Sequence, residues 1–264
     1  MSEPVMESPT PVRTAVAGRP RSRFLAIVRY TLRSCLPPKR LIAVALACVA
    51  TILLGLLARV IDDTAVRAFA QVAADAVFGL TVPAASLMIG DAVLGAEIRR
   101  GTFHFTWLLP APAGLIVLGR WVGGCIVALA TITPACAVAA VVAGAPSAVP
   151  AALVAAAVGS CSYVAIFIAI GCLTQRTASW SLAFVFLIER LLGAALTGIA
   201  QLSPSWESRA IFVGLLDDEA PRSLVRTGIP DGSGAIVRLA IVSAVALGIA
   251  VWRMGHLRLS GAAD

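Results

Sequence analysis

The chain has 264 residues, of which 59% are hydrophobic and only 13% are charged, and its formal net charge is +7. Soluble domains carry about a quarter charged residues, so this composition excludes an ordinary water-soluble protein and indicates that lipid surrounds much of the chain. We attribute the positive charge to the Lys and Arg bias that sets membrane topology, and we expect no nucleic-acid partner. Lys39 is the only lysine. This preference for arginine is typical of a GC-rich genome, and we expect a bacterial cell membrane.

The first 40 residues form a polar, basic arm that contains one segment with helical periodicity, residues 23–36. On a helix with 3.6 residues per turn, Arg29 and Arg33 share the polar face. Pro37 and Pro38 end the segment. The pattern predicts an amphipathic interfacial helix at the cytoplasmic membrane surface, and a plain basic arm that only sets topology is the alternative. The arm is too long for a signal peptide and lacks a cleavage site. The apolar face comprises Phe24, Leu25, Val28, Leu32, Cys35 and Leu36.

Six apolar segments follow, each near the roughly 20 residues that a membrane helix needs. We expect Gly79 and Pro83 to kink the second and Pro134 to kink the third. The fold prediction is an all-α integral membrane protein with six transmembrane helices. It divides the chain into a cytoplasmic arm (1–40), a six-span membrane domain (41–252) and a cytoplasmic tail (253–264). The six segments cover about residues 41–61, 66–94, 115–143, 148–173, 178–200 and 235–252.

The charges between these segments predict the orientation of the protein. If the helices alternate, the basic arm, the second and fourth connections and the tail share one side of the membrane. Most of the acidic residues fall on the other side, so the positive-inside rule places both termini in the cytoplasm. The outward acidic residues are Asp62, Asp63, Glu207, Asp217, Asp218, Glu219 and Asp231.

The outer connection before the last span, about residues 201–234, is unusually apolar. Trp206, Phe212 and their aliphatic neighbours are too apolar for an exposed loop and too few to cross a bilayer. An interfacial or re-entrant helix fits this segment, and a small extracellular cap fits equally well.

Four charged residues of the apolar segments are the candidates for intramembrane charges: Asp75, Asp91, Glu189 and Arg190. A charge in the middle of a bilayer costs about 2.5–3.5 kcal/mol on insertion scales, so each side chain should face protein or water. Glu189 and Arg190 are the deepest, and adjacent residues on a helix do not face each other. They form either a polar pathway lining or structural ion pairs between helices or subunits.

The sequence offers almost nothing for catalysis. A P-loop needs Gly-Lys followed by Ser or Thr, whereas Lys39 stands between Pro38 and Arg40. The two histidines, His104 and His256, have no metal-ligand spacing around them, and the six cysteines show no C-x-x-C pair. We therefore expect no enzyme activity, metal or cofactor in this chain.

The second connection, "GAEIRRGTFHFTWLLPAPAGLIVLGR" from Gly95 to Arg120, differs from the apolar segments on both sides. Its first part, residues 97–109, could form a short helix that Gly101 lets bend and Pro110 ends. Apolar anchors ringed by charges are typical of a helix that docks into a groove, and an ordinary interfacial aromatic belt is the alternative. The candidate docking residues are Glu97, Arg99, Arg100, Gly101, Thr102, Phe103, Phe105, Trp107 and Pro110.

The same connection resembles the first cytoplasmic loop of ABC-2 permeases, the membrane subunits of one class of ABC transporters. The matching elements are Glu97, Gly101-Thr102, Leu108-Leu109, Pro110, the aliphatic run 116–118 and Gly119-Arg120. The chain departs from the family pattern at Ala113, where Arg is usual, and at Arg120, where Lys is common.

The resemblance implies a permease, favouring export, with a short cytoplasmic coupling helix between spans two and three. ATP and magnesium would bind a separate P-loop ATPase subunit, and a second permease copy or a paralogue would complete a dimer in the lipid bilayer. The residues alone leave two alternatives open. One is an ion-coupled secondary transporter that uses Asp75, Asp91 and Glu189, and the other is a membrane scaffold subunit without transport.

Overall fold

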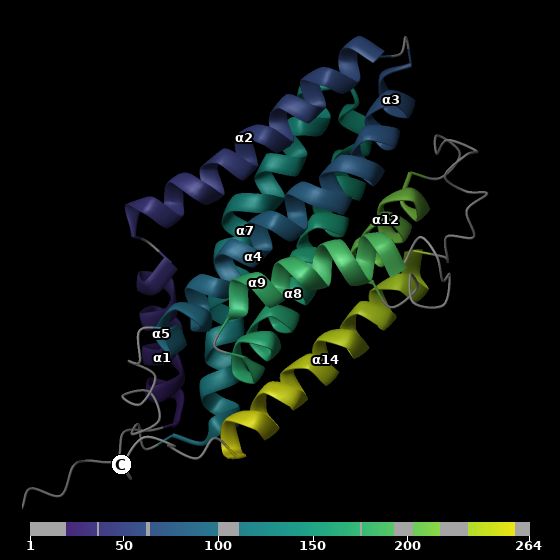
Figure 1. Cartoon of the computed structure of the whole chain (residues 1–264). Helices are drawn as coiled ribbons and strands as arrows, with labels where there is room; N and C mark the ends of the chain where they lie inside the picture. The colour runs from purple at the N-terminus through teal and green to yellow at the C-terminus, as the bar shows by residue number, and fades with distance from the viewer. Residues whose placement is uncertain are drawn as a thin grey trace, which may run out of the picture.

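The computed structural model describes residues 20–35, 37–61, 64–99, 111–174, 176–192, 203–216 and 232–256. Within these ranges the chain is helical and contains no strand, so the all-α prediction is confirmed. The long helices run side by side in one bundle (Figure 1). The N-terminal helix α1, the short helix α5 and the end of the last helix α14 gather at the same end of it. These three elements cover Pro20–Cys35, Ala96–Arg99 and Gly232–His256.

Five helical stretches are long and apolar enough to cross a membrane, by length and composition. They overlap the first four predicted segments and the sixth. This architecture fits a multi-pass membrane protein. The stretches are α2 (Pro38–Ile61), the composite helix Ala65–Gly95, α7 (Ala113–Val142), η3 with α8 (Pro146–Leu173) and α14.

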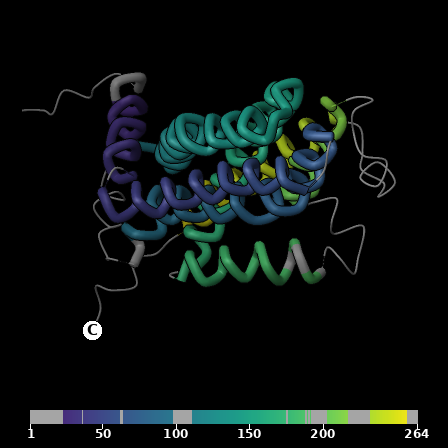
Figure 2. Tube along the Cα trace, turned by 90° about the horizontal axis from the view of Figure 1, so that it is seen from above, coloured from purple at the N-terminus to yellow at the C-terminus, as the bar shows by residue number. Residues whose placement is uncertain are grey.

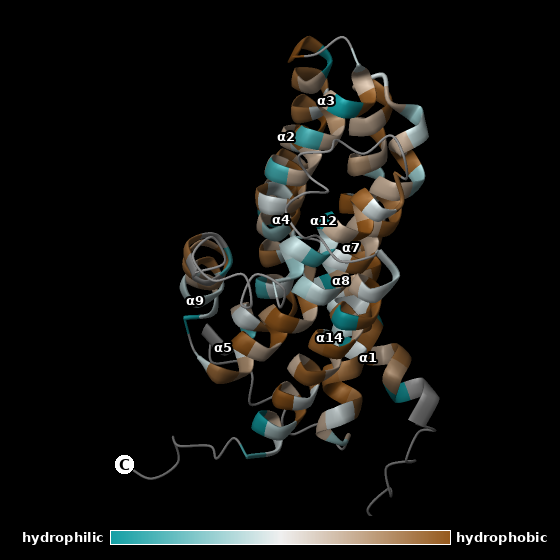
Figure 3. Ribbon diagram, turned by 90° about the vertical axis from the view of Figure 1, so that its right-hand side faces the viewer, coloured by the Kyte–Doolittle hydropathy of each residue, from teal (hydrophilic) through white to brown (hydrophobic). Residues whose placement is uncertain are grey.

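The surfaces of the long helices support lipid contact. On α2 and α14 the exposed apolar side chains recur every three or four residues, which forms one stripe along each helix. Contiguous apolar surface of this length is rare on soluble proteins, and Figure 3 shows hydrophobic residues along these helices. The stripes comprise Ile42, Leu46, Val49, Leu53 and Leu57 on α2, and Val237, Ile241, Val245, Ile249 and Trp252 on α14.

The second long helix is interrupted by two wider π-helical segments. It runs through α3 (Ala65–Val72), η1 (Ala73–Thr81), α4 (Val82–Gly90), η2 (Asp91–Gly95) and α5. The predicted kink residue Gly79 lies inside η1, and Pro83 follows directly in the first turn of α4. Proline lacks an N–H and crowds the carbonyl four residues earlier. Pro83 therefore explains why the regular α-helical hydrogen bonding is interrupted in η1. Pro134 lies inside α7, which stays helical over its full length.

The predicted fifth span differs from the other five. Its described part consists of α9 (Thr177–Ala183) and η4 (Phe184–Leu192), a shorter apolar helix, and residues 193–202 lie outside the described part. In Figures 2 and 3 this helix stands to one side of the bundle, and Figure 3 shows it nearly end-on while α2 runs lengthwise. A sixth membrane span therefore stays a prediction.

The outer connection contains a buried helix, α12 (Pro204–Gly214), which packs against α8, α14 and η1. Ile211 and Phe212 are fully buried. The Phe212 ring packs against Phe69 and Phe78 of the second long helix, with centroid distances of 6.0 and 5.2 Å. Both an interfacial or re-entrant helix and a small cap were considered for this segment, and the structure forms a helix there that buries Ile211 and Phe212 between its neighbours.

Helix α1 packs against α7 with small residues at the contact. An added Cβ on Gly119 would lie 2.8 Å from Ile27, and one on Gly123 would lie 2.7 Å from Thr31. Ile27 and Thr31 are accordingly buried. Of the predicted apolar face, Val28 and Cys35 are buried, whereas Leu25 is 65% exposed. The packing onto α7 thus fixes which face of α1 points outward.

Candidate functional site

The two ends of the connection between the second and third long helices are joined by a buried ion pair. Glu97 lies in α5, at the end of the second long helix, and Arg120 lies in the second turn of α7. The Arg120 Nη1 and Nη2 atoms donate to the Glu97 Oε1 and Oε2 atoms at 2.8 and 2.7 Å. Arg120 is 2% exposed and Glu97 is 8% exposed. This two-pronged geometry is the strongest form of a guanidinium–carboxylate contact.

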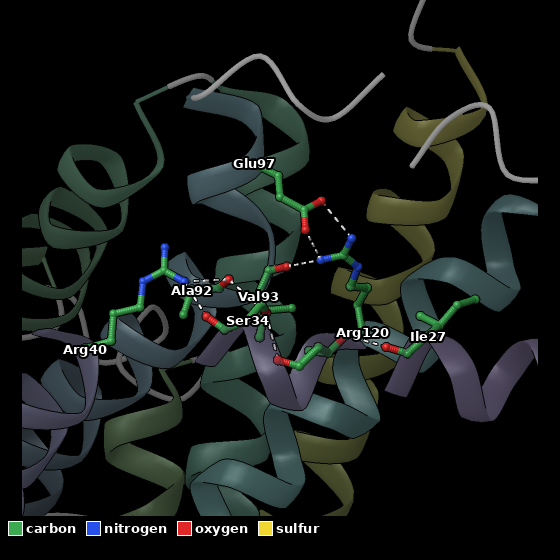
Figure 4. A network of polar contacts seen from close by, with 8 residues as sticks. Ile27, Ser34, Arg40, Ala92, Val93, Glu97 and Arg120 are labelled. Atoms are coloured by element: carbon green, nitrogen blue, oxygen red, sulfur yellow. Dashed lines mark hydrogen bonds and ion pairs between the residues drawn. The ribbon is translucent and has the colours of Figure 1, made fainter. Parts of the chain in front are cut away.

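The Arg120 guanidinium makes two further contacts, of which Figure 4 shows the hydrogen bond to Val93. Its Nη1 atom donates to the Val93 carbonyl at 2.6 Å, and its Cζ atom lies 5.0 Å from the centre of the Tyr30 ring of α1. Partial burial and the nearby Glu97 carboxylate raise the pKa of the Tyr30 phenol. We call Tyr30, Val93, Glu97 and Arg120 the Glu97 cluster. It ties α1, the end of the second long helix and the start of α7 together.

The π segment η2 supplies backbone acceptors to this region. Its geometry is shown by the Ala96 amide, which bonds to the carbonyl of Asp91, five residues earlier. Besides the contact at Val93, the Ala92 carbonyl accepts from the Arg40 Nη1 atom at 3.4 Å and from the Ser34 hydroxyl at 3.5 Å (Figure 4). Arg40 also donates to the Ser34 carbonyl at 2.6 Å. The end of α1 and the start of α2 are therefore bound to the same segment as Arg120.

Only part of the predicted docking segment lies within the described residues. Glu97 and Arg99 belong to α5, and the structure describes the side chain of Glu97 but not that of Arg99. The remaining predicted residues lie outside the described ranges, so the docking role of this segment stays a prediction. These residues are Arg100, Gly101, Thr102, Phe103, Phe105, Trp107 and Pro110.

The three predicted intramembrane carboxylates lie in the three π segments of the described chain: Asp75 in η1, Asp91 in η2 and Glu189 in η4. The structure does not join them in one site. Asp75 and Asp91 are separated by more than four turns of one helix, about 24 Å at 1.5 Å per residue, and Glu189 contacts a different set of helices. π segments occur often at functional sites.

Asp75 and Asp91 have separate surroundings. The Asp75 Oδ1 atom pairs with Arg209 Nη2 of α12 at 3.2 Å, and Gln71 donates to Asp75 Oδ2 at 3.2 Å. The Asp91 carboxylate lies over Gly95, where an added Cβ would be 2.5 Å from its Oδ1 atom and 3.1 Å from the Thr177 hydroxyl. Asp75 thus links η1 to α12, and Asp91 lies near the start of α9.

Glu189 is the most deeply buried of the three predicted intramembrane carboxylates, with 7% of its surface exposed. The Tyr163 hydroxyl of α8 donates to its Oε2 atom at 2.6 Å, and the hydroxyls of Ser203 and Ser205, next to the start of α12, lie beside the same carboxylate. The contact joins η4 to the bundle. Arg190 lies in η4 as well, and its side chain is outside the described set.

A further buried carboxylate, Glu207 of α12, was not among the predicted intramembrane sites. It is fully buried, and its Oε1 atom lies 3.3 Å from Arg238 Nη1 of α14. Burial raises the pKa of the Glu207 carboxyl, and the Arg238 guanidinium opposes that shift. Together with the Asp75–Arg209 pair, this contact holds α12 between η1 and α14.

The role of Arg120 as the partner of Glu97 was not predicted from the sequence. A signal was present, because Arg120 lies inside the third apolar segment, and a charged residue there requires a partner. The role of Tyr163 as the donor to Glu189 was not predicted either, because a single tyrosine in an apolar run does not indicate a hydrogen-bond partner.

Comparison with known proteins adds no family assignment to this geometry. No model of a known protein family matches the chain, and no curated protein matches it. Among the described residues, no group of three or more His, Cys, Asp or Glu side chains could hold a metal ion.

Proposed function

We propose that this chain is the membrane subunit of an ATP-driven ABC transporter of the ABC-2 type, favouring export, that works with a separate P-loop ATPase and a second permease copy or paralogue. The observation that carries the proposal is the buried pair between Glu97 and Arg120. These residues stand at the start and end of the loop motif on which the resemblance rests. Five helices long and apolar enough to cross a bilayer support the same proposal.

The physical argument concerns how force would pass from the ATPase to the membrane helices. A docking segment between residues 97 and 110 transmits movement only if its ends are rigidly attached to the helices that must move. The Glu97 cluster provides such an attachment, because one buried guanidinium holds the end of the second long helix, the start of α7 and helix α1. ATP-driven closure of two ATPase subunits would then rock these three elements together.

The test is co-purification from native membranes in mild detergent, followed by mass spectrometry and an ATP hydrolysis assay. We expect the tagged native chain to retain a P-loop ATPase and the Trp107→Ala variant to lose most of it, because a central aromatic anchor typically contributes 2 kcal/mol or more, about 30-fold in affinity. Trp252→Ala is the matched control, since Trp252 is 60% exposed near the end of α14. Recovery of no ATPase with the native chain, or equal recovery with both variants, would contradict the proposal.

The buried Glu189–Tyr163 contact favours a second candidate, an ion-coupled secondary transporter. In that case Glu189 would bind and release the coupling ion, and transport into proteoliposomes would need an ion gradient but no ATP. Glu189→Gln would abolish this transport because the amide cannot ionise, whereas Tyr163→Phe would reduce it by removing one donor to the carboxylate. ATP-dependent transport that survives Glu189→Gln would reject this candidate.

A further inference from the structure

We propose that the outward face of α1 is a binding surface for anionic phospholipids in the leaflet at that end of the bundle. The face consists of Leu25, Arg29, Tyr30 and Arg33, and Lys39 follows at the start of α2. Arg29 and Arg33 lie four residues apart on one side of the helix, and Leu25, at the edge of the predicted apolar face, adjoins Arg29. All five residues are exposed.

The packing of α1 leaves this face free for a ligand. Ile27, Val28, Thr31 and Cys35 are buried on the opposite side of the helix, and Gly119 and Gly123 of α7 allow the close approach. Figure 2 shows α1 at one end of the bundle, running across the direction of α2 in that view. The cationic side is thus held outward by the fold.

The charge of this region fits an anionic partner. No Asp or Glu occurs between Glu7 and Asp62, a stretch that includes all of α1 and α2. Arg29, Arg33 and Lys39 therefore have no acidic neighbour along the sequence. Lys and Arg side chains near a membrane attract anionic headgroups, and each such side chain raises the affinity by about five-fold.

The position of the charges favours a lipid over a protein partner. Two residues after Lys39 the exposed surface becomes apolar at Leu41, and Ile42 begins the stripe along α2. Basic residues at the boundary between an apolar stripe and a polar end lie at the level of lipid headgroups. Leu25 and Tyr30 provide apolar and amphipathic contacts at the same level.

The test is a titration with phosphatidylglycerol or phosphatidylcholine in detergent, followed by native mass spectrometry. We expect the native protein to prefer phosphatidylglycerol, and we expect Arg29→Gln/Arg33→Gln to weaken that binding by about 25-fold, which is about five-fold per charge. Arg59→Gln/Arg67→Gln is the matched control. It removes the exposed Arg59, near the opposite end of α2, and the exposed Arg67 of α3, on either side of Asp62 and Asp63 in the sequence. This control should bind phosphatidylglycerol within about two-fold of native.

Several outcomes would overturn the proposal: equal affinity for the two lipids, unchanged binding by the α1 variant, or an equal loss in both double variants. Retained lipid binding with loss of a co-purifying protein would assign the face to a protein partner instead. Because both arginines are exposed, the variant should keep the native thermal midpoint. If it does not, the single variants Arg29→Gln and Arg33→Gln, each with an expected loss of about five-fold, decide the question.

Discussion

Replacement of Arg120 by alanine is expected to lower the free energy of unfolding by about 3–5 kcal/mol, the usual cost of removing one partner of a buried ion pair. The variant leaves the Glu97 carboxylate buried without its two charge-assisted hydrogen bonds, and it leaves the Val93 carbonyl without the Arg120 donor. The measurement is the midpoint of unfolding in detergent, followed by helical circular dichroism during titration with sodium dodecyl sulfate.

A double-mutant cycle separates the ion pair from lost packing. Glu97→Leu combined with Arg120→Leu should cost clearly less than the sum of the single changes, because neither charge is then left buried alone. Arg120→Lys should be intermediate, since an ammonium group keeps the charge but cannot make the two-pronged contact. As a control, Arg59→Ala should change the free energy of unfolding by no more than about 0.5 kcal/mol, because Arg59 is exposed near the end of α2. Additive losses in the cycle would show that the pair contributes little as a unit.

Under the proposed function, the same Arg120 variants should uncouple ATP hydrolysis from transport. Their residual stability can be checked first, so that a loss of transport in a folded Arg120→Lys variant reports on coupling rather than on folding.

Replacement of Gly55 by leucine is the second change with a large expected effect, a loss of about 1–3 kcal/mol from overpacking. Gly55 lies on the face of α2 that meets α7, and a Cβ at this position would collide with the backbone carbonyl of Ala139. Backbone atoms cannot move aside like the end of a flexible side chain, so the two helices must separate. Small residues let neighbouring helices pack closely, and this close packing is a common source of stability in membrane proteins.

The alanine variants make this test sharper. Alanine favours a helix over glycine by about 1 kcal/mol, and at Gly248 of α14 an added Cβ meets nothing within 4 Å. Gly248→Ala should therefore be neutral or stabilising in the same unfolding titration, whereas Gly55→Ala should be destabilising despite its higher helix propensity. Equal shifts for the two variants would show that α2 and α7 tolerate a wider separation.

Hydropathy along the chain was sufficient to locate the long apolar helices, because the roughly 20 apolar residues that a bilayer requires are a local property of the sequence. It also indicated that the segment around Trp206 and Phe212 is too apolar for an exposed loop, but left a helix and a cap equally open. The residues of the loop motif, from Glu97 to Arg120, were recognisable as an interruption between two apolar segments. Their docking role and the number of spans remain predictions.

Only the tertiary structure decided which charged residues meet. Glu97 and Arg120 are 23 residues apart, and their contact depends on how α5 and α7 pack, which no local pattern specifies. The same holds for Glu189 with Tyr163 and for Glu207 with Arg238, because each pair joins separate helices. Hydrophobic periodicity states which residues avoid water, whereas the pairing of buried charges follows from helix packing and from the cost of leaving a charge alone in an apolar interior.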